Sequence, residues 1–226
     1  MATSQVTAEQ ILDTALQLAE GQSWAALRLH DIAGKLDITL DQIHSLYSQK
    51  DDIAEALLDR ADRTMLAAAN TADFLEQPLK ERLQYLIMAW LGALAPHRHI
   101  TGEILQYKML LLHVHLQLHG LTRISRTMQW LCEAAVLESL DRSTQRELEE
   151  IGITAIYLRT FQYWLSDDSA DSENTQQLLS RLLNRAEKLG ELIFGPHDNI
   201  TGGHNTASEL SKTHRHANTG DEATSH

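Results

Sequence analysis

Apolar residues recur every three or four positions along most of the chain, which is the spacing of one face of an α-helix. The first repeat follows Thr7-Ala8-Glu9-Gln10, a capping-box arrangement that starts a helix. A short helix is predicted over residues 29–36. A third begins at Thr39-Leu40-Asp41-Gln42, which repeats the capping box and places Ile43, Leu46 and Tyr47 inward. With a break at Asp37-Ile38, these elements predict a helix-turn-helix.

Longer helices are predicted beyond this segment. One covers residues 50–70, and the next continues until Pro96, which cannot continue a helix. Residues 100–140 predict two or three helices with a break near Gly120, because glycine weakens a helix interior. Two final helices are predicted over residues 143–166 and 172–194.

The pattern divides the chain into three parts. Residues 1–49 form the predicted helix-turn-helix domain, and residues 50–194 form a larger helical domain for ligand binding and dimerisation. Residues 195–226 lose the apolar repeat and are rich in polar residues and glycine, which predicts a disordered tail.

The last two predicted helices carry more apolar positions than one domain core requires. They therefore predict a homodimer in which two such pairs form a four-helix interface. The positions that carry this prediction are Ile153, Ile156, Tyr157, Leu178, Leu182, Leu183 and Leu189.

Composition supports an all-α fold and excludes several classes of protein. Only three prolines interrupt the chain, and the long stretches between them are rich in strong helix formers. No apolar run reaches the roughly 18 residues of a membrane span, and no basic segment followed by an apolar run begins the chain, so a cytoplasmic protein is expected. Cys132 is the single cysteine, which excludes an internal disulfide and a cysteine-based zinc cluster.

One segment resembles the DNA-binding part of the TetR family of transcriptional regulators. It runs through Ile32-Ala33-Gly34-Lys35-Leu36-Asp37-Ile38-Thr39 and continues in Ile43, Tyr47 and Lys50. The resemblance implies a TetR-repressor-like fold in which the helix from Leu40 enters the major groove of DNA and Lys50 contacts a phosphate. Near the C-terminus, the closing helix pair of many TetR-like regulators is matched by Tyr157, Thr160, Trp164-Leu165, Asp167, Ser169, Asp171 and Thr175.

A ligand-responsive regulator bound to operator DNA is the function that this resemblance implies. Charged anchors and neutral hydrogen-bonding side chains together make the predicted DNA-contacting set. That set is Arg28, Lys35, Thr39, Gln42, His44, Ser45, Gln49 and Lys50.

The same segment departs from the family pattern. Asp37 stands where the family usually has glycine, His44 where it has tyrosine, and Leu46 where it has histidine. Residues 1–64 carry five basic and eleven acidic side chains, a net charge of −6, within a chain whose net charge is −12. Since DNA is recognised largely through its phosphates, one alternative is that the helix-turn-helix survives only as a packing unit.

A second resemblance gives that alternative a function. The closing helix-pair pattern also resembles TetR-fold accessory proteins of ubiquinone biosynthesis, which bind lipid rather than DNA. The alternative hypothesis is therefore a protein that binds a lipid or isoprenoid and carries an eroded helix-turn-helix.

The larger domain is expected to enclose a small apolar or amphipathic ligand. Aromatic residues and nearby polar side chains make up the predicted lining, which is Trp90, Tyr107, His113, His115, Arg126, Gln129, Trp130 and Tyr157. The histidines between Pro96 and Gly120 do not predict a metal, because most are two residues apart and no carboxylate or cysteine completes a site. No catalytic motif occurs, so neither an enzyme nor a cofactor is predicted.

Overall fold

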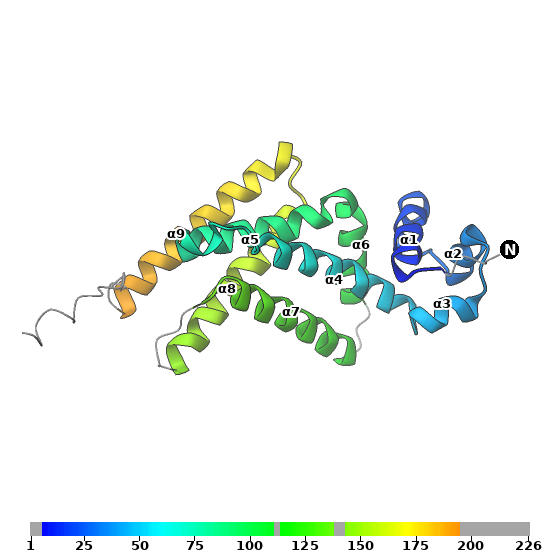
Figure 1. The fold of residues 1–226 in the computed structure, drawn as a ribbon, viewed down its shortest axis with the longest axis horizontal. Helices are drawn as coiled ribbons and strands as arrows, with labels where there is room; N and C mark the ends of the chain where they lie inside the picture. The colour runs from blue at the N-terminus through cyan, green and yellow to red at the C-terminus, as the bar shows by residue number, and fades with distance from the viewer. Residues whose placement is uncertain (1–5, 111–113, 138–142, 195–226) are drawn as a thin grey trace, which may run out of the picture. The chain divides into compact units, whose positions relative to one another are not determined.

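The computed structural model describes residues 6–110, 114–137 and 143–194. Every regular element in these ranges is a helix, which confirms the all-α prediction (Figure 1). The α-helices are α1 (Ala8–Gln22), α2 (Leu29–Leu36), α3 (Leu40–Leu46), α4 (Lys50–Ala68), α5 (Leu79–Leu94), α6 (Arg98–Leu110), α7 (Val114–Ala134), α8 (Ser143–Trp164) and α9 (Glu173–Phe194). Three short 3₁₀ helices join them, namely η1 (Phe74–Glu76), η2 (Ala95–His97) and η3 (Ala170–Ser172).

Residues up to Lys188 form one compact unit, and those from Leu189 form a second, of which residues 189–194 are described. Within the first unit α4 packs against both α1 and α5. The boundary between residues 49 and 50 stays a prediction. The predicted disordered tail lies outside the described residues.

The N-terminal helices form around their predicted caps. Thr7 and Gln10 make a complete capping box at the start of α1, and Thr39 and Gln42 make another at the start of α3. Figure 1 shows α1, α2 and α3 side by side, and Ile11, Leu16, Ile32 and Ile43 fill the space between them. Burying each such side chain contributes about 1.5–3 kcal/mol, so packing rather than local propensity holds these short helices.

Two sequence expectations, one about α3 and one about α7, are wrong. Leu46, predicted to face inward, is 41% exposed, because Ile43 and Tyr47 already occupy the buried side of the helix-turn-helix. The predicted break at Gly120 is absent, since α7 runs without interruption through that position. One interior glycine costs a helix only about 1 kcal/mol, which the rest of a 21-residue helix offsets.

An aromatic cluster forms the centre of the core behind the first helices. Trp90 of α5 packs edge to face on Tyr157 and Phe161 of α8, with ring centroids 5.3 and 5.2 Å apart. Trp164 stacks on Phe161 at 6.0 Å, and the guanidinium of Arg98 lies over its ring. The cluster fixes α5 against α8.

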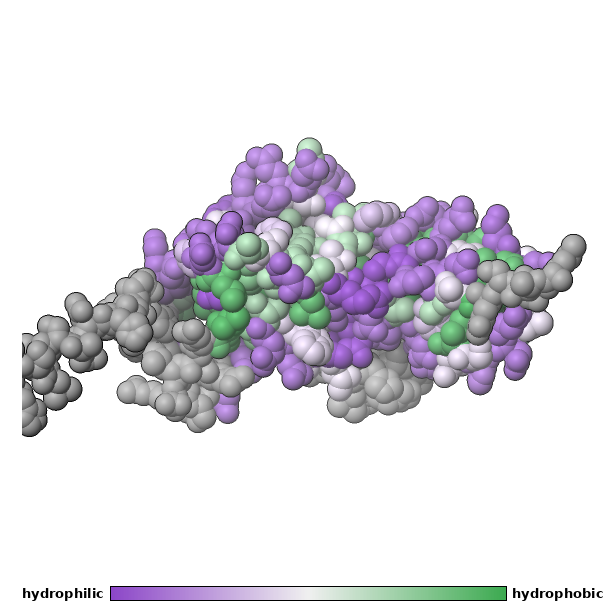
Figure 2. Space-filling model, in the orientation of Figure 1, coloured by the Kyte–Doolittle hydropathy of each residue, from purple (hydrophilic) through white to green (hydrophobic). Residues whose placement is uncertain are grey.

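Helix α8 carries apolar side chains on two faces. Ile153, Tyr157 and Phe161 are buried within the chain, whereas Leu148, Ile151 and Leu158 are 52%, 65% and 39% exposed. Figure 2 shows that the visible surface is mostly hydrophilic, with separate hydrophobic patches. Leu148, Ile151 and Leu158 form a row of exposed aliphatic side chains on α8.

Candidate nucleic-acid interface

The turn between α2 and α3 keeps its geometry although an aspartate fills it. Asp37 has φ 54° and ψ 47°, the left-handed conformation that glycine adopts most easily and aspartate tolerates. Its backbone N–H and that of Ile38 both donate to the carbonyl of Ala33, which closes the end of α2. The chain therefore enters α3 directly at the N-cap Thr39.

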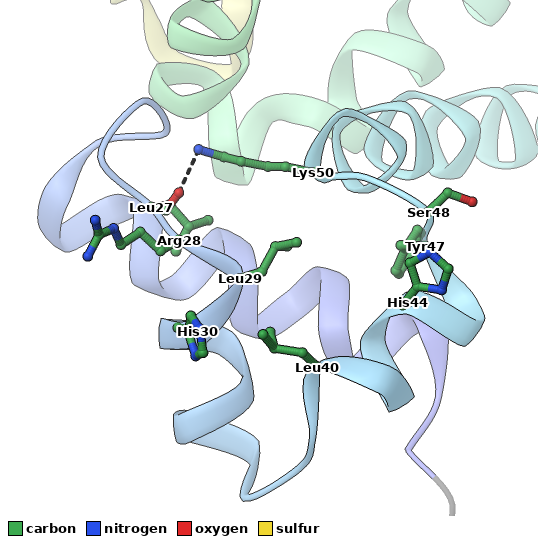
Figure 3. A pocket seen from close by; sticks show the side chains of 9 residues that line it. All are labelled: Leu27, Arg28, Leu29, His30, Leu40, His44, Tyr47, Ser48 and Lys50. Carbon is green, nitrogen blue, oxygen red and sulfur yellow. Dashed lines mark hydrogen bonds between the residues drawn. The ribbon is translucent and has the colours of Figure 1, made fainter.

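A groove of about 530 Å³ opens where the start of α2, the helix α3 and the start of α4 meet (Figure 3). Leucine side chains from both α2 and α3 line it, and basic side chains lie near them. Its lining is Leu27, Arg28, Leu29, His30, Leu40, His44, Tyr47, Ser48 and Lys50. This combination suits a ligand that carries negative charge beside apolar groups.

Three of the predicted DNA-contacting residues are exposed and form no ion pair within the described part of the chain. They are Arg28 at the start of α2, Lys35 at its end and His44 on α3. Two of them, Arg28 and His44, also line the groove. Their side chains have no acidic partner to displace before they meet a phosphate or a base.

Four others hold the ends of helices. The amide oxygen of Gln42 accepts a hydrogen bond from the N–H of Thr39 at 2.9 Å, and the Thr39 hydroxyl accepts one from the N–H of Gln42. Ser45 donates to the Gln42 carbonyl at 2.8 Å, and Gln49 donates to Asp52 at 3.1 Å. Gln42 cannot offer both its oxygen and its nitrogen to an adenine while this cap is intact.

Lys50 is turned toward the loop between α1 and α2. Its Nζ donates to the carbonyl oxygens of Trp24 and Leu27, the latter at 2.7 Å, and lies 5.3 Å from the centre of the Trp24 ring. Burial lowers the pKa of its amine from the ordinary value. Lys50 thus stabilises the loop that precedes Arg28, and its contact with a DNA phosphate stays a prediction.

The remaining basic residues of this region are paired with acids. Arg60 contacts Glu9 and lies 2.7 Å from Asp13, and Arg63 lies 2.7 Å from Glu9. These pairs join α1 to α4. Within residues 6–64, Arg28 and Lys35 are therefore the arginine and lysine side chains that neither pair with an acid nor donate to a group of backbone carbonyls.

The predicted ligand-lining residues occupy different environments. Trp90 and Tyr157 contact each other in the core, whereas Gln129 and Trp130 are exposed and Arg126 lies on the surface, 2.8 Å from Asp59. The side chains of Tyr107, His113 and His115 lie outside the described residues. A ligand contact by any of these residues stays a prediction.

Sequence reasoning missed a buried ionic cluster between α4 and α7. Arg123 lies 2.9 Å from both Asp62 and Asp59, and Asp62 also accepts hydrogen bonds from Trp90 Nε1 at 2.8 Å and Thr127 at 3.1 Å. Asp62 is only 7% exposed. The sequence did contain a signal for this cluster. Asp62 follows the buried Ala61 and precedes the buried Met65 by three residues, which places its carboxylate on the inward face of α4.

Two histidines near the start of α6 pair with acids, His97 with one on α1 and His99 with one on α6 itself. His97 pairs with Glu20 at 3.1 Å, and His99 pairs with Glu103 at 3.3 Å. In the part of the chain that the structure describes, no three histidine, cysteine or acidic residues are placed to hold a metal ion. None of the described helices is long and apolar enough to cross a membrane.

No family model matches the chain, and no curated protein matches it at a significant level. Among solved structures, the TetR transcriptional regulator from Nitrosomonas europaea ATCC 19718 is 42% identical over 79% of this chain and 97% of its own, with a TM-score of 0.70. A TetR-family regulator from Streptomyces coelicolor (14% identity, 82% of each chain, TM-score 0.58) shares the fold. So does the TetR family repressor AlkX from Dietzia (14% identity, 82% of this chain and 98% of its own, TM-score 0.51). Because the Nitrosomonas regulator is matched at this identity over nearly its whole length, the chain belongs to the TetR family of transcriptional regulators.

Proposed function

We propose that this regulator is a homodimer that binds operator DNA through α2 and α3 and responds to a small apolar or amphipathic ligand. The observation that carries the proposal is the groove beside α3, which Arg28 and His44 border without ion pairs within the described residues. A recognition helix of this kind inserts into the major groove while side chains at the start of the preceding helix hold the phosphates.

Helix α6 supports the ligand response, because it contacts both the loop before α2 and the turn between α8 and α9. Glu103 on α6 accepts a hydrogen bond from the backbone N–H of Trp24, in the loop before α2. At the start of α6, Arg98 donates to the carbonyl of Asp167 and to the hydroxyl of Ser172, in the turn between α8 and α9. A ligand that favours one position of α6 would therefore shift the population of positions that the helix-turn-helix of α2 and α3 adopts.

The apolar stripe of α8 supports the homodimer. Leu148, Ile151 and Leu158 are separated by three and seven residues, so they lie on one side of the helix. Of the positions on which the sequence prediction rested, Ile153, Ile156, Tyr157 and Leu183 are buried within one chain. The exposed stripe is therefore the better candidate for the surface that contacts a second copy in the proposed homodimer.

The test is binding to DNA from the protein's own upstream region across a salt series. If phosphate contacts carry the affinity, Arg28→Ala and Lys35→Ala should each lower the slope of log affinity against log salt by about one. Arg63→Ala is the matched control, because it removes the same charge from a residue already paired with Glu9. Equal slopes in all three variants would contradict the proposed interface.

The scarcity of unpaired basic residues among residues 6–64 favours the second candidate, a lipid-binding protein with an eroded helix-turn-helix. That function predicts no salt-sensitive binding to any DNA, and a lipid or isoprenoid in organic extracts of the purified protein. Mass spectrometry of those extracts, together with the salt series, separates the two functions.

A further inference from the structure

The recognition helix carries an exposed apolar side chain as well as polar ones. Its Thr39, Gln42 and Ser45 side chains form the capping and local hydrogen bonds described above. Leu40, its first residue, is nevertheless 39% exposed. Exposed leucines such as Leu75 also occur elsewhere on this surface, but Leu40 stands at the start of the recognition helix and lines the groove beside it, where contact with a base would remove it from water.

The groove gives Leu40 a defined setting. Leu40 of α3 lines the groove together with Leu29 and His30 of α2, and His44 lies one turn further along α3 (Figure 3). Aliphatic and basic side chains thus line the same groove. DNA fits this chemistry because a base edge with an apolar group lies beside negatively charged phosphates, and thymine is the unmodified base whose major-groove edge carries a methyl group.

We propose that Leu40 makes the α3 helix specific for thymine at one position of each half-site, through contact with the C5 methyl. The inference rests on the proposed DNA binding. A thymine methyl against the leucine removes both from water, whereas a cytosine amino group or a guanine oxygen at the same place would lose a hydrogen bond to water and gain none. Leu40 therefore discriminates both by attraction and by leaving the wrong bases unsatisfied.

Deoxyuridine tests the inference, because it differs from thymidine only by that methyl. The preferred site is first selected from random DNA with the full-length protein, and each thymine is then replaced singly by deoxyuridine. We expect one replacement in each half-site to weaken binding about fivefold, the effect of one apolar contact. Fluorescence anisotropy measures the dissociation constants.

Leu40→Ala should bind the thymine and deoxyuridine sites equally at that position. The matched control is Leu75→Ala, since Leu75 is 63% exposed on η1, outside the helix-turn-helix, and its variant should keep the full preference. Circular dichroism checks that both variants fold, as expected for exposed leucines.

Two results would overturn the inference while leaving the proposed function intact. One is salt-sensitive binding that no deoxyuridine replacement weakens, and the other is a Leu40→Ala protein that keeps the thymine preference. Absence of salt-sensitive binding to every DNA would overturn the inference together with the proposed function, and the salt series identifies that case.

Discussion

Glu103 on α6 accepts a hydrogen bond from the backbone N–H of Trp24, 2.6 Å away and 79 residues earlier in the sequence. The Trp24 side chain is fully buried, and Lys50 donates a hydrogen bond to the Trp24 backbone carbonyl. Both the N–H and the carbonyl of Trp24 are therefore held by side chains from α6 and α4. The relationship makes α6 the direct support of the loop that carries Arg28.

Glu103→Ala should loosen this loop and lower the free energy of unfolding by about 1.5–3 kcal/mol, because a hydrogen bond to a carboxylate is lost and the Trp24 amide is left without its acceptor. Hydrogen exchange of the segment around Trp24 should accelerate. Glu133→Ala, an exposed change on α7, serves as the control. Unchanged exchange around Trp24 would argue against a coupling role for Glu103.

Asp37 predicts a clear order of stability among variants of the turn. Asp37→Gly and Asp37→Ala both remove the carboxylate, but only glycine accepts φ 54° without steric strain. The glycine variant should be more stable than the alanine variant by about 1 kcal/mol in urea denaturation. An alanine variant of equal stability would show that the turn relaxes away from this conformation.

Asp167 predicts a loss of stability in acid. Its burial raises the pKa, but hydrogen bonds from Ser169 and Thr175 outweigh burial and hold the pKa below the ordinary value of 3.8. Since the folded-state pKa is the lower one, the carboxylate stabilises the fold above about pH 4, and this contribution is lost as the pH falls further.

Asp167→Asn should therefore destabilise the protein by about 2 kcal/mol at pH 7, and the difference from the unmodified protein should shrink below pH 4. Urea denaturation at both pH values measures it. Asp168→Asn is the control, because Asp168 is exposed next to it. A difference that stays constant with pH would mean that the hydrogen bonds, rather than the charge, determine the effect.

The buried pair of Arg123 and Asp62 predicts a non-additive double mutant. Arg123→Met should cost about 3–5 kcal/mol, because Asp62 keeps its charge in the core without its cation. Adding Asp62→Asn should recover part of this loss, since the amide oxygen can still accept the Trp90 N–H. Additive losses in a denaturation cycle would indicate that the two side chains act separately.

The α8 stripe predicts the oligomeric state. Ile151→Glu places a charge at a side chain that is 65% exposed in one chain, so it should leave folding intact and convert a dimer to a monomer. Light scattering at micromolar concentration measures the mass. Leu75→Glu, at a similarly exposed residue outside α8, should remain dimeric.

Local chemistry made much of this fold predictable. The two Thr-to-Gln capping boxes and the three-to-four-residue apolar repeat depend on neighbours in sequence, so both helix starts and the buried Ile43 and Tyr47 followed from the sequence. The directions of long polar side chains depend on distant partners. The turn of Lys50 toward Leu27 and the hydrogen bond from Trp24 to Glu103 therefore required the structure.

Helix α8 shows the same limit in the core. Its apolar residues cover two faces, and periodicity alone cannot say which face meets α5 and which stays exposed. The candidate DNA interface was predicted in outline, because Arg28, Lys35 and His44 are exposed as expected. The groove itself needed the distance between α2 and α3, which no spacing in the sequence supplies.

If the chain binds DNA as proposed, its net charge of −12 repels the phosphates at long range, because Arg60 and Arg63 are already paired with Glu9 and Asp13. Basic regulators associate rapidly because their charge steers them, and they then slide along the phosphates. For this charge the encounter is slowed, and because salt screens the repulsion beyond about 10 Å, adding salt should speed association even as it shortens the life of the complex. If the chain binds DNA as proposed, three-dimensional collisions are expected to contribute more to its search than sliding, so the search time would depend on how many copies the cell holds.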